Sequence, residues 1–236
     1  MTTIAAYDPH ADWYEDAVSD PANSYYLRVM GVLRDLLGPG SGTCLDLCCG
    51  TGINAMPVRD LGWTPVGVDL SAGQLRHGSR RLPVARGDAT ALPVADASVP
   101  AVVCVLAHTD MPDYAGALRE AGRVLRPGGR FVHLSVHPCF VGAFADRSDA
   151  ARLVIDTRYA DRSHTHDSWT PHGMRARIGA WHLTLADLLN ATNAAGLRMV
   201  RAVESGPDDG VVDVFGFVAY RAFSGNQAPD GIPAAT

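Results

Sequence analysis

Short apolar segments alternate with helical patterns through the middle of this sequence, and that alternation constrains the fold more than any other feature. Between the last two apolar segments, residues 113–125 place apolar side chains at helical spacing, and an Arg-Pro-Gly-Gly sequence then ends the helix. Strands that alternate with helices predict a parallel sheet with right-handed crossovers. The predicted parallel strands are Cys44–Leu47, Thr64–Leu70, Pro83–Ala89, Val99–Ala107 and Arg130–Val136.

The C-terminal part follows a different pattern. An amphipathic helix is predicted over Leu183–Leu197, and two strand-like segments follow at Arg198–Glu204 and Val211–Phe223. The short turn that joins these strands predicts a hairpin, so the last strand should run antiparallel to the rest. The expected fold is therefore a doubly wound, Rossmann-like α/β domain with a seven-stranded sheet.

Two further segments lie outside this plan. Residues 1–42 combine helical patterns with many aromatic side chains, and we expect them to form an N-terminal helical lid. Residues 137–182 show no clean period, and a structureless loop of that length is unusual in a compact domain. We therefore expect residues 137–182 to form a substrate cap, inserted after the fifth strand of a domain that covers residues 43–236.

Composition excludes several kinds of function. All 20 basic residues of the 236-residue chain are arginine, which excludes a Schiff-base lysine, a pyridoxal enzyme and a Walker-type phosphate loop. A net charge of −5 makes nucleic acid an unexpected partner. The 5 cysteines, without paired Cys-x-x-Cys elements, indicate a reduced protein, and no apolar run reaches the length of a membrane span. We expect a cytoplasmic monomer or homodimer with no membrane partner.

The strongest local signal is the sequence Leu-Asp-Leu-Cys-Cys-Gly-Thr-Gly at residues 45–52, where the first predicted strand ends. Glycine lets the backbone approach a ligand closely and frees amide groups at the start of the next helix. Asp69 ends the second strand, where an acid can accept hydrogen bonds from ribose hydroxyls. Residues 50–55 also fit the Gly-x-Gly-x-x-Ala pattern of nucleotide sites, which alone is a weak signal. The glycines by themselves are also compatible with a tight strand–helix turn that binds nothing.

Four segments in this order and spacing, LDLCCGTG, GVDLS, GDATALP and LREAGRVLRPGGRF, closely resemble class I S-adenosylmethionine-dependent methyltransferases of the small-molecule, methyltransferase-11-like type. The resemblance covers nearly the whole chain, because the opening YDPHADWYED is similar to the N-terminal lid of small-molecule members. It implies S-adenosylmethionine as cofactor and S-adenosylhomocysteine as product. The sequence departs from the family where Cys48 replaces the first glycine of a DxGxG turn, although some quinone methyltransferases carry a similar CCG turn.

The resemblance also assigns residues to the cofactor. Tyr14 is a further candidate by its own chemistry, because an aromatic face over the sulfonium suits a cation, and ordinary helix packing is the alternative for this side chain. The implied contacts are Asp46, Cys48, Gly50 and Gly52 with the methionine portion, Asp69 with the ribose, Leu70, Asp88 and Ala89 with the adenine, and Leu106 beside the methionine group.

Two histidines are the candidate general bases for an oxygen or nitrogen acceptor. His137 follows the fifth strand and His108 follows the fourth, and ligands of open α/β sheets bind at these carboxyl ends. Histidine can act as a base near neutral pH. Alternatively, His137 hydrogen-bonds the loop before Pro138, and catalysis rests on alignment of the reactants. His164 and His166 lack a matching acid motif, so no metal site is expected.

The sequence as a whole predicts a methyltransferase that moves a methyl group to oxygen or nitrogen of a small, partly apolar molecule, such as a specialised metabolite. A C-methyltransferase acting on a quinone-like ring is the alternative enzyme. An NAD-dependent oxidoreductase and a non-catalytic cofactor-binding subunit are the alternatives from other classes. The aromatic candidates for binding the acceptor, which also suit packing within the lid and cap, are Tyr7, Trp13, Phe140, Tyr159 and Trp169.

Overall fold

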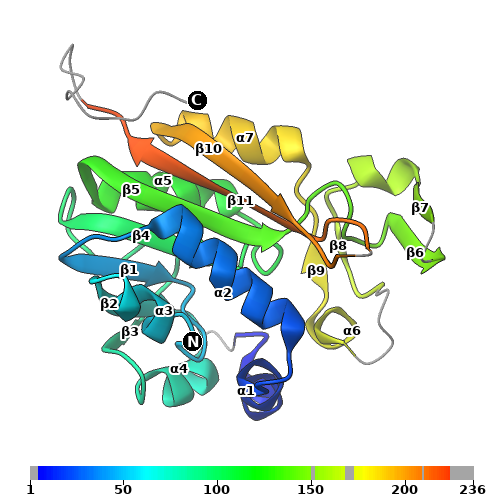
Figure 1. Cartoon of the computed structure of the whole chain (residues 1–236), viewed down its shortest axis with the longest axis horizontal. Coiled ribbons are helices and arrows are strands. Elements are labelled where there is room, and N and C mark those ends of the chain that lie inside the picture. The colour runs from blue at the N-terminus through cyan, green and yellow to red at the C-terminus, as the bar shows by residue number, and fades with distance from the viewer. Residues whose placement is uncertain (1–4, 150–151, 168–172, 209, 224–236) are drawn as a thin grey trace.

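A seven-stranded sheet in the order β10-β11-β5-β4-β1-β2-β3 forms the centre of the computed structural model (Figure 1), which describes residues 5–149, 152–167, 173–208 and 210–223. Neighbouring strands from β3 to β5 pair in parallel, whereas β11 runs antiparallel to both β5 and β10. The predicted sheet and its antiparallel last strand are thereby confirmed. The strands are β1 (Thr43–Leu47), β2 (Thr64–Asp69), β3 (Val84–Arg86), β4 (Val99–Val105), β5 (Leu125–Val136), β10 (Leu197–Ser205) and β11 (Val214–Arg221).

Helices cover both faces of this sheet, because a buried strand presents alternate side chains to opposite sides. Val132 and Leu134 of β5 belong to one apolar cluster with Leu33 of α2, whereas Phe131 belongs to another with Leu118 of α5. All five side chains are buried, which confirms the predicted doubly wound arrangement. The helices of these layers are α2 (Ser24–Leu37), α3 (Ala55–Asp60), α4 (Ala72–Gly78), α5 (Tyr114–Val124) and α7 (Leu185–Ala194).

Strand β5 begins earlier than the sequence predicted. Helix α5 has Asp113 as its N-cap, whose carboxylate accepts from the Gly116 amide at 2.7 Å, and the helix ends at Val124. The Arg-Pro-Gly-Gly sequence then lies inside β5, where the register with β4 shifts. Gly128 has a φ of +74° there, so an irregular stretch of strand carries the chain out of the helix without a separate loop.

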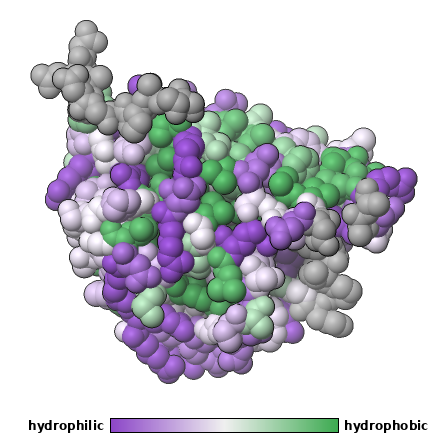
Figure 2. All heavy atoms as spheres, in the orientation of Figure 1, coloured by the Kyte–Doolittle hydropathy of each residue, from purple (hydrophilic) through white to green (hydrophobic). Residues whose placement is uncertain are grey.

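The N-terminal segment divides into two parts with different partners. Helix α2 belongs to the central packing, since Leu33 is fully buried. The preceding η1 (Asp8–His10) and α1 (Ala11–Ser19) contact α4 instead. Asp8 fastens this part by accepting from the Ser71 hydroxyl at 2.6 Å. The surface over α1 and α4 is largely hydrophilic (Figure 2), so this part of the chain adds a polar cover to one end of the molecule.

The described residues between 137 and 182 form short elements that project from one end of the sheet (Figure 1). Their shortness explains why no long period is visible in the sequence. Trp169, a predicted acceptor residue, lies outside the described residues. Within the described ranges, no helix is long and apolar enough to cross a membrane. The elements are the antiparallel pair β6 (Ala145–Asp149) and β7 (Arg152–Ile155), η2 (Thr157–Ala160), α6 (Met174–Ile178), and the antiparallel pair β8 (His164–Thr165) and β9 (Ala180–Trp181).

Candidate active site

A cavity of about 410 Å³ lies at the carboxyl ends of β1, β2 and β4, where this fold binds ligands. Cavities of roughly 300–1,000 Å³ hold cofactor-sized molecules. Two residues that the resemblance assigned to the cofactor, Asp46 and Gly52, do not line this cavity. The predicted residues that do line it are Tyr14, Cys48, Gly50, Asp69, Leu70, Asp88, Ala89 and Leu106, together with Tyr7 of the predicted acceptor set.

Two non-glycine residues adopt left-handed backbone conformations at this cavity. Cys48, in the turn after β1, has a φ of +59°, and Leu106, directly after β4, has a φ of +57°. The Leu106 amide donates to the Leu134 carbonyl at 2.7 Å, which holds the strained conformation in place. Such conformations cost about 1–3 kcal/mol each and are concentrated at functional sites. Because β1 and β4 are neighbours in the sheet, the strain converges on one place.

Gly50 and Gly52 serve different purposes in the turn. Gly50 has a φ of +52° and lines the cavity, where its backbone faces the ligand space. A Cβ atom at Gly52 would lie 2.4 Å from the Leu82 side chain and 3.2 Å from Cα of Gly78. Glycine at position 52 therefore lets the turn pack against the end of α4.

Asp69 ends β2 and joins the two loops around the cavity. Its Oδ2 accepts from the Gly50 amide at 2.9 Å, and its Oδ1 accepts from the Ser71 amide at 2.8 Å. Burial raises the pKa of this carboxyl above its usual range, while the two amide donors oppose that shift. Each carboxylate oxygen has a second lone pair, so Asp69 can also accept from ribose hydroxyls.

Asp46 lies in β1 outside the cavity wall and is 1% exposed. Both of its oxygens accept from Nδ2 of Asn54, each at 3.2 Å. Burial raises the pKa of Asp46 to about 7, and the Asn54 amide opposes that shift. Asn54 is not among the residues expected at the site. Its signal was a polar residue at the N-cap of α3, inside the Gly-x-Gly-x-x-Ala pattern.

The loop after β3 supplies a second acid to the cavity. Oδ1 of Asp88 accepts from both the amide and the hydroxyl of Thr90, each at 2.8 Å, and this local turn fixes the carboxylate. Ala89 follows it and is 9% exposed. Met111 and Asp113, from the loop after β4, also line the cavity. A methionine in a loop carries no pattern that marks it as a ligand contact, so Met111 was missed.

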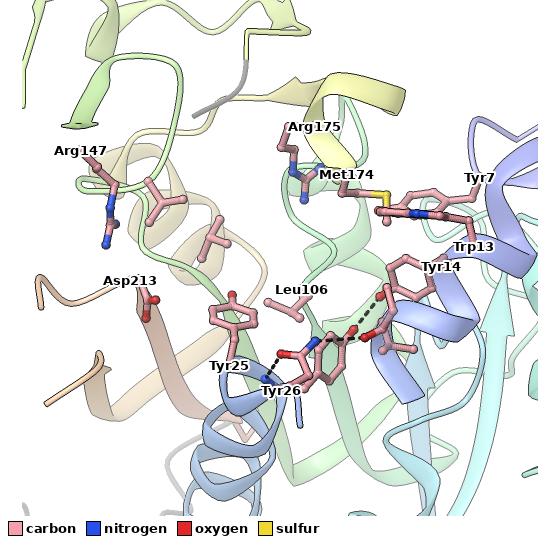
Figure 3. Close-up of a pocket in the computed structure, with 15 residues that line it drawn as sticks. Tyr7, Trp13, Tyr14, Tyr25, Tyr26, Leu106, Arg147, Met174, Arg175 and Asp213 are labelled. Atoms are coloured by element: carbon pink, nitrogen blue, oxygen red, sulfur yellow. Dashed lines mark hydrogen bonds between the residues drawn. The ribbon is translucent and has the colours of Figure 1, made fainter. Parts of the chain in front are cut away.

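A second cavity, of about 510 Å³, adjoins the first (Figure 3). The two cavities share Tyr7, Tyr14 and Leu106, and we name these three residues the neck. Of the predicted acceptor residues, Tyr7 and Trp13 line the second cavity. Burial raises the pKa of Tyr14 to about 12, so its hydroxyl stays neutral at physiological pH. The other side chains labelled in this cavity are Tyr25, Tyr26, Arg147, Met174, Arg175 and Asp213.

Phe140 and Tyr159 contribute to the packing of the cap instead. Phe140 stacks on the ring of His137, with the ring centroids 4.3 Å apart. Tyr159 packs edge-on against Phe144, with the centroids 5.2 Å apart, and its hydroxyl accepts from the Leu185 amide at 3.1 Å. Neither side chain lines the first or the second cavity, so these two display the packing role that the sequence left open.

Asp110 joins the lid and the cap to the loop after β4. The Tyr7 hydroxyl donates to Oδ2 of Asp110 at 3.0 Å, and Arg175 of α6 forms an ion pair with Oδ1. The side chains of Arg175 and Asp110 are 13% and 16% exposed, so the pair is shielded from water. No local pattern marks Asp110 or Arg175 as site residues, because the lid, the loop and the cap are far apart in the chain.

The two candidate bases line neither the first nor the second cavity. His137 is 1% exposed, its Nδ1 accepts from the Cys139 amide at 3.1 Å, and its Nε2 donates to Glu204 at 2.8 Å. That geometry favours a structural role for His137, in which its ring hydrogen-bonds the adjoining loop, over a role as general base. His108 packs beside His133, with the ring centroids 5.5 Å apart, and burial lowers the pKa of His108 well below its usual value.

The fold and the two cavities define a class of protein, namely an enzyme that holds a nucleoside-containing cofactor next to a second small molecule. The residues present fit S-adenosylmethionine by their chemistry. Asp69 and Asp88 offer acceptors for hydroxyl and amine donors, and the aromatic rings of Tyr7 and Tyr14 suit a sulfonium cation.

Comparison with known proteins agrees with this class. Residues 45–133 match a family described as a methyltransferase domain. A curated relative from Mycolicibacterium paratuberculosis, named demethylmenaquinone methyltransferase, is 43% identical over 178 residues, which cover 70% of this chain and 73% of the relative. Other relatives of the same name match over 37–41% of this chain and 39–42% of their own length. The chain belongs to the S-adenosylmethionine-dependent methyltransferases, and S-adenosylmethionine is its cofactor.

Solved structures share the fold at lower sequence identity. An S-adenosylmethionine-dependent methyltransferase from Mesorhizobium loti has a TM-score of 0.66 and 22% identity, covering 85% of this chain and 99% of that one. A geranyl diphosphate C-methyltransferase from Streptomyces coelicolor has a TM-score of 0.61 and 20% identity, covering 87% and 89%. The predicted Rossmann-like class is confirmed, and membership of the family removes the NAD-dependent oxidoreductase alternative.

Proposed function

We propose that this enzyme transfers the methyl group of S-adenosylmethionine to an oxygen or nitrogen atom of a small, partly apolar molecule bound in the second cavity, where the rings of Tyr14, Tyr25 and Tyr26 suit an aromatic acceptor. The observation that carries this proposal is the neck, where both cavities meet at Tyr7, Tyr14 and Leu106. Methyl transfer is an in-line substitution, so the donor and the acceptor must lie next to each other with water excluded. A neck between two cavities of molecular size meets that requirement.

In the first cavity, each part of the cofactor is bound by residues at the end of a different strand. Asp69 accepts from the ribose hydroxyls, and Asp88 with the Ala89 amide binds the adenine. The turn at Gly50 faces the methionine portion, and Tyr14 presents a neutral aromatic ring to the sulfonium. The cofactor supplies an already activated methyl group, so these residues bind and orient it.

Alignment supplies most of the catalysis in this proposal. The carboxylate nearest the neck, Asp110, already accepts from Tyr7 and pairs with Arg175. His108 is held neutral by burial, and His137 bonds within its own loop. An acceptor that arrives as a phenolate or a neutral amine needs no base, because its nucleophilic lone pair is already available.

The relative from Mycolicibacterium paratuberculosis favours a second candidate, because its name describes methylation of demethylmenaquinone. C-methylation of a quinone-like ring in the same cavity would use the same neck. The two candidates differ in the atom that receives the methyl group, and this atom can be read directly from the product.

The test uses S-adenosylmethionine carrying a ¹³C-labelled methyl group, incubated with the enzyme and a small-molecule extract. The carbon shift of the labelled methyl separates attachment to oxygen, nitrogen and ring carbon in one spectrum. We expect an oxygen- or nitrogen-bound methyl. A carbon-bound methyl would support the second candidate, and no labelled product beyond a no-enzyme control would contradict both.

A further inference from the structure

The far side of the second cavity contains a cation without a matching carboxylate. Arg147, on β6, lies across the cavity from the neck residues Tyr7 and Tyr14 (Figure 3). Its guanidinium donates to two backbone carbonyls, at 3.2 Å to Phe140 and 3.4 Å to Val211. These are long hydrogen bonds to neutral acceptors. Among the described residues, Arg147 forms no ion pair.

The other charges around this cavity are already paired. Asp213 lines the cavity, and both of its oxygens accept from Nη2 of Arg28, at 2.6 and 2.8 Å. Arg175 lines the cavity as well, and it is paired with Asp110. These two pairs balance in charge, so Arg147 leaves the cavity with an unmatched positive charge. A partly enclosed cation of this kind favours an anionic ligand.

A buried hydroxyl gives a second, independent indication. Oη of Tyr25 is buried and has no hydrogen-bond partner within the described part of the chain. Tyr25 lines the cavity, and Figure 3 shows its hydroxyl pointing into the space between Asp213 and Leu106. The Arg28 guanidinium lies 5.4 Å from the centre of the Tyr25 ring and limits where the ring can turn. An unmade hydrogen bond of this kind costs about 1–3 kcal/mol, which a ligand oxygen would recover.

Burial, with the nearby Asp213 carboxylate, raises the pKa of Tyr25. Its hydroxyl therefore keeps its proton at physiological pH and can act as a donor. Arg147 also lines a neighbouring hollow, whose other polar side chains are Asp146, Ser148, Arg158 and Asp167. A long apolar tail would meet polar and charged groups there, whereas a compact anion would not.

We propose that the methyl acceptor is a compact aromatic acid whose carboxylate is bound by Arg147 and the Tyr25 hydroxyl. This inference rests on the proposed function and specifies its substrate class. The carboxylate end is held away from the neck, so the opposite end of the ring presents its hydroxyl or amine toward Tyr7, Tyr14 and Leu106. The arrangement selects the reacting atom by anchoring the group that does not react.

The test measures binding, by calorimetry, to the enzyme saturated with S-adenosylhomocysteine, so that no turnover is needed. The probes are 4-hydroxybenzoate, 4-hydroxyphenylacetate and 4-hydroxycinnamate, which place the carboxylate at three distances from the hydroxyl, with the primary amide of each. We expect at least one acid to bind the wild type roughly tenfold or more tightly than its amide. Hydrogen bonds to a charged group differ from neutral ones by about that much.

Variants locate the effect. Arg147→Gln should abolish the preference for acid over amide, and Tyr25→Phe should reduce it by roughly 3–10-fold. Arg152→Gln is the matched control, because Arg152 lies on the neighbouring strand β7 and lines none of the cavities described above. Equal binding of acid and amide, a preference that survives Arg147→Gln, or failure of every acid to bind would overturn the proposal. Failure of S-adenosylhomocysteine to bind would instead contradict the cofactor site, so the two failures are distinguishable.

Discussion

The two cavities that meet at the neck are built in opposite ways. The cofactor cavity comes mainly from the turns after successive strands of one sheet, with close backbone bonds such as those from Gly50 and Ser71 to Asp69. The second cavity, which we propose as the acceptor cavity, is assembled from the lid, α2, the cap and the segment before β11. Long-range side-chain pairs hold it together, including Arg175–Asp110 and Arg28–Asp213. Substitutions in the lid and cap can therefore alter the acceptor site while the cofactor site, which is built from the sheet, keeps its structure.

The largest expected effect concerns the acceptor side. Arg175→Gln should lower the free energy of unfolding by about 3–5 kcal/mol, because the shielded Asp110 loses its ion-pair partner. Denaturant unfolding measures this change. The control is Arg177→Gln on the same helix, whose guanidinium lies 4.3 Å from the centre of the Trp13 ring and should contribute about 1 kcal/mol. Equal losses of unfolding free energy in the two variants would mean that the ion pair with Asp110 is not the main contribution of α6 to stability.

The next effect tests burial on the cofactor side through pH. Asp46 has a pKa of about 7 in the folded protein because it is buried. Between about pH 4 and 7 the folded state keeps a proton that the unfolded chain has released. The contribution of Asp46 to the free energy of unfolding therefore falls as the pH rises through this window, by up to about 1.4 kcal/mol per pH unit, and levels off above it.

Asp46→Asn provides the comparison, because it removes the titrating group and keeps an acceptor for Asn54. In unfolding measurements without cofactor, taken from pH 4.5 to pH 8, the stability of the wild type should fall relative to that of the variant as the pH rises, by up to about 1.4 kcal/mol per pH unit below pH 7. Asp69, whose pKa is also raised by burial, contributes with the same sign. His108 and His133, whose pKa values are lowered by burial, contribute with the opposite sign, and all three contributions are present in both proteins. Identical slopes in wild type and variant would show that Asp46 does not carry the dependence.

Asp69→Ala should weaken cofactor binding by about 1.5–3 kcal/mol, the scale of hydrogen bonds to a charged acceptor. Calorimetry with S-adenosylhomocysteine measures the change. Asp60→Ala serves as the control, since its half-exposed carboxylate pairs only with Arg34, at 3.2 Å, among the described residues. Unchanged affinity in a folded Asp69→Ala protein would remove the ribose contact from the cofactor site.

His137→Ala separates two roles for one side chain. Loss of the acceptor for the Cys139 amide should cost about 1–3 kcal/mol of stability, with turnover changing by less than roughly tenfold. A general base would instead lose about 10²–10⁴-fold in rate. His166→Ala, at an exposed position in the cap, controls for general effects on this segment. A rate loss of the larger size without loss of stability would restore His137 as the base.

The smallest effect is expected at Cys48. Cys48→Gly relieves the left-handed strain and adds freedom to the unfolded chain, so stability should change by less than about 1 kcal/mol. Cofactor affinity should change less than about threefold, since the thiol itself is not assigned a hydrogen bond to the cofactor. Cys49→Gly, which empties a buried position, should cost more. A large loss of cofactor binding in Cys48→Gly would reveal a direct role for the thiol.

The contrast between the cavities also explains what the sequence could predict. The parallel strands, the C-terminal hairpin, the glycine turn and the place of Asp69 follow from local patterns, because turns after strands lie at fixed places in the chain. The other residues expected at the cofactor were implied by the resemblance to the family. Asp110 and Arg175 carried no such pattern, since their contact depends on how the lid and cap settle. The direction of the His137 ring depends on Glu204, in the distant strand β10, which no local reading includes.

The same limit applies to residue type. Phe140, Tyr159 and Trp13 were equivalent in the sequence as aromatic residues of the lid or cap. Only Trp13 lines the acceptor cavity, whereas Phe140 stacks on His137 and Tyr159 packs on Phe144. An aromatic ring buries a similar area in either place, so its type does not decide which one it occupies.

All three neck residues are anchored. The Tyr7 hydroxyl bonds to Asp110, the Tyr14 hydroxyl lies 2.7 Å from that of Tyr26, and the Leu106 backbone is fixed in its left-handed turn. An opening with three fixed walls limits the size of the alkyl group that can be transferred through it. Synthetic sulfonium donors that carry ethyl or allyl in place of methyl would need a smaller side chain at Leu106, which makes that single position the place to broaden the enzyme's alkylation chemistry.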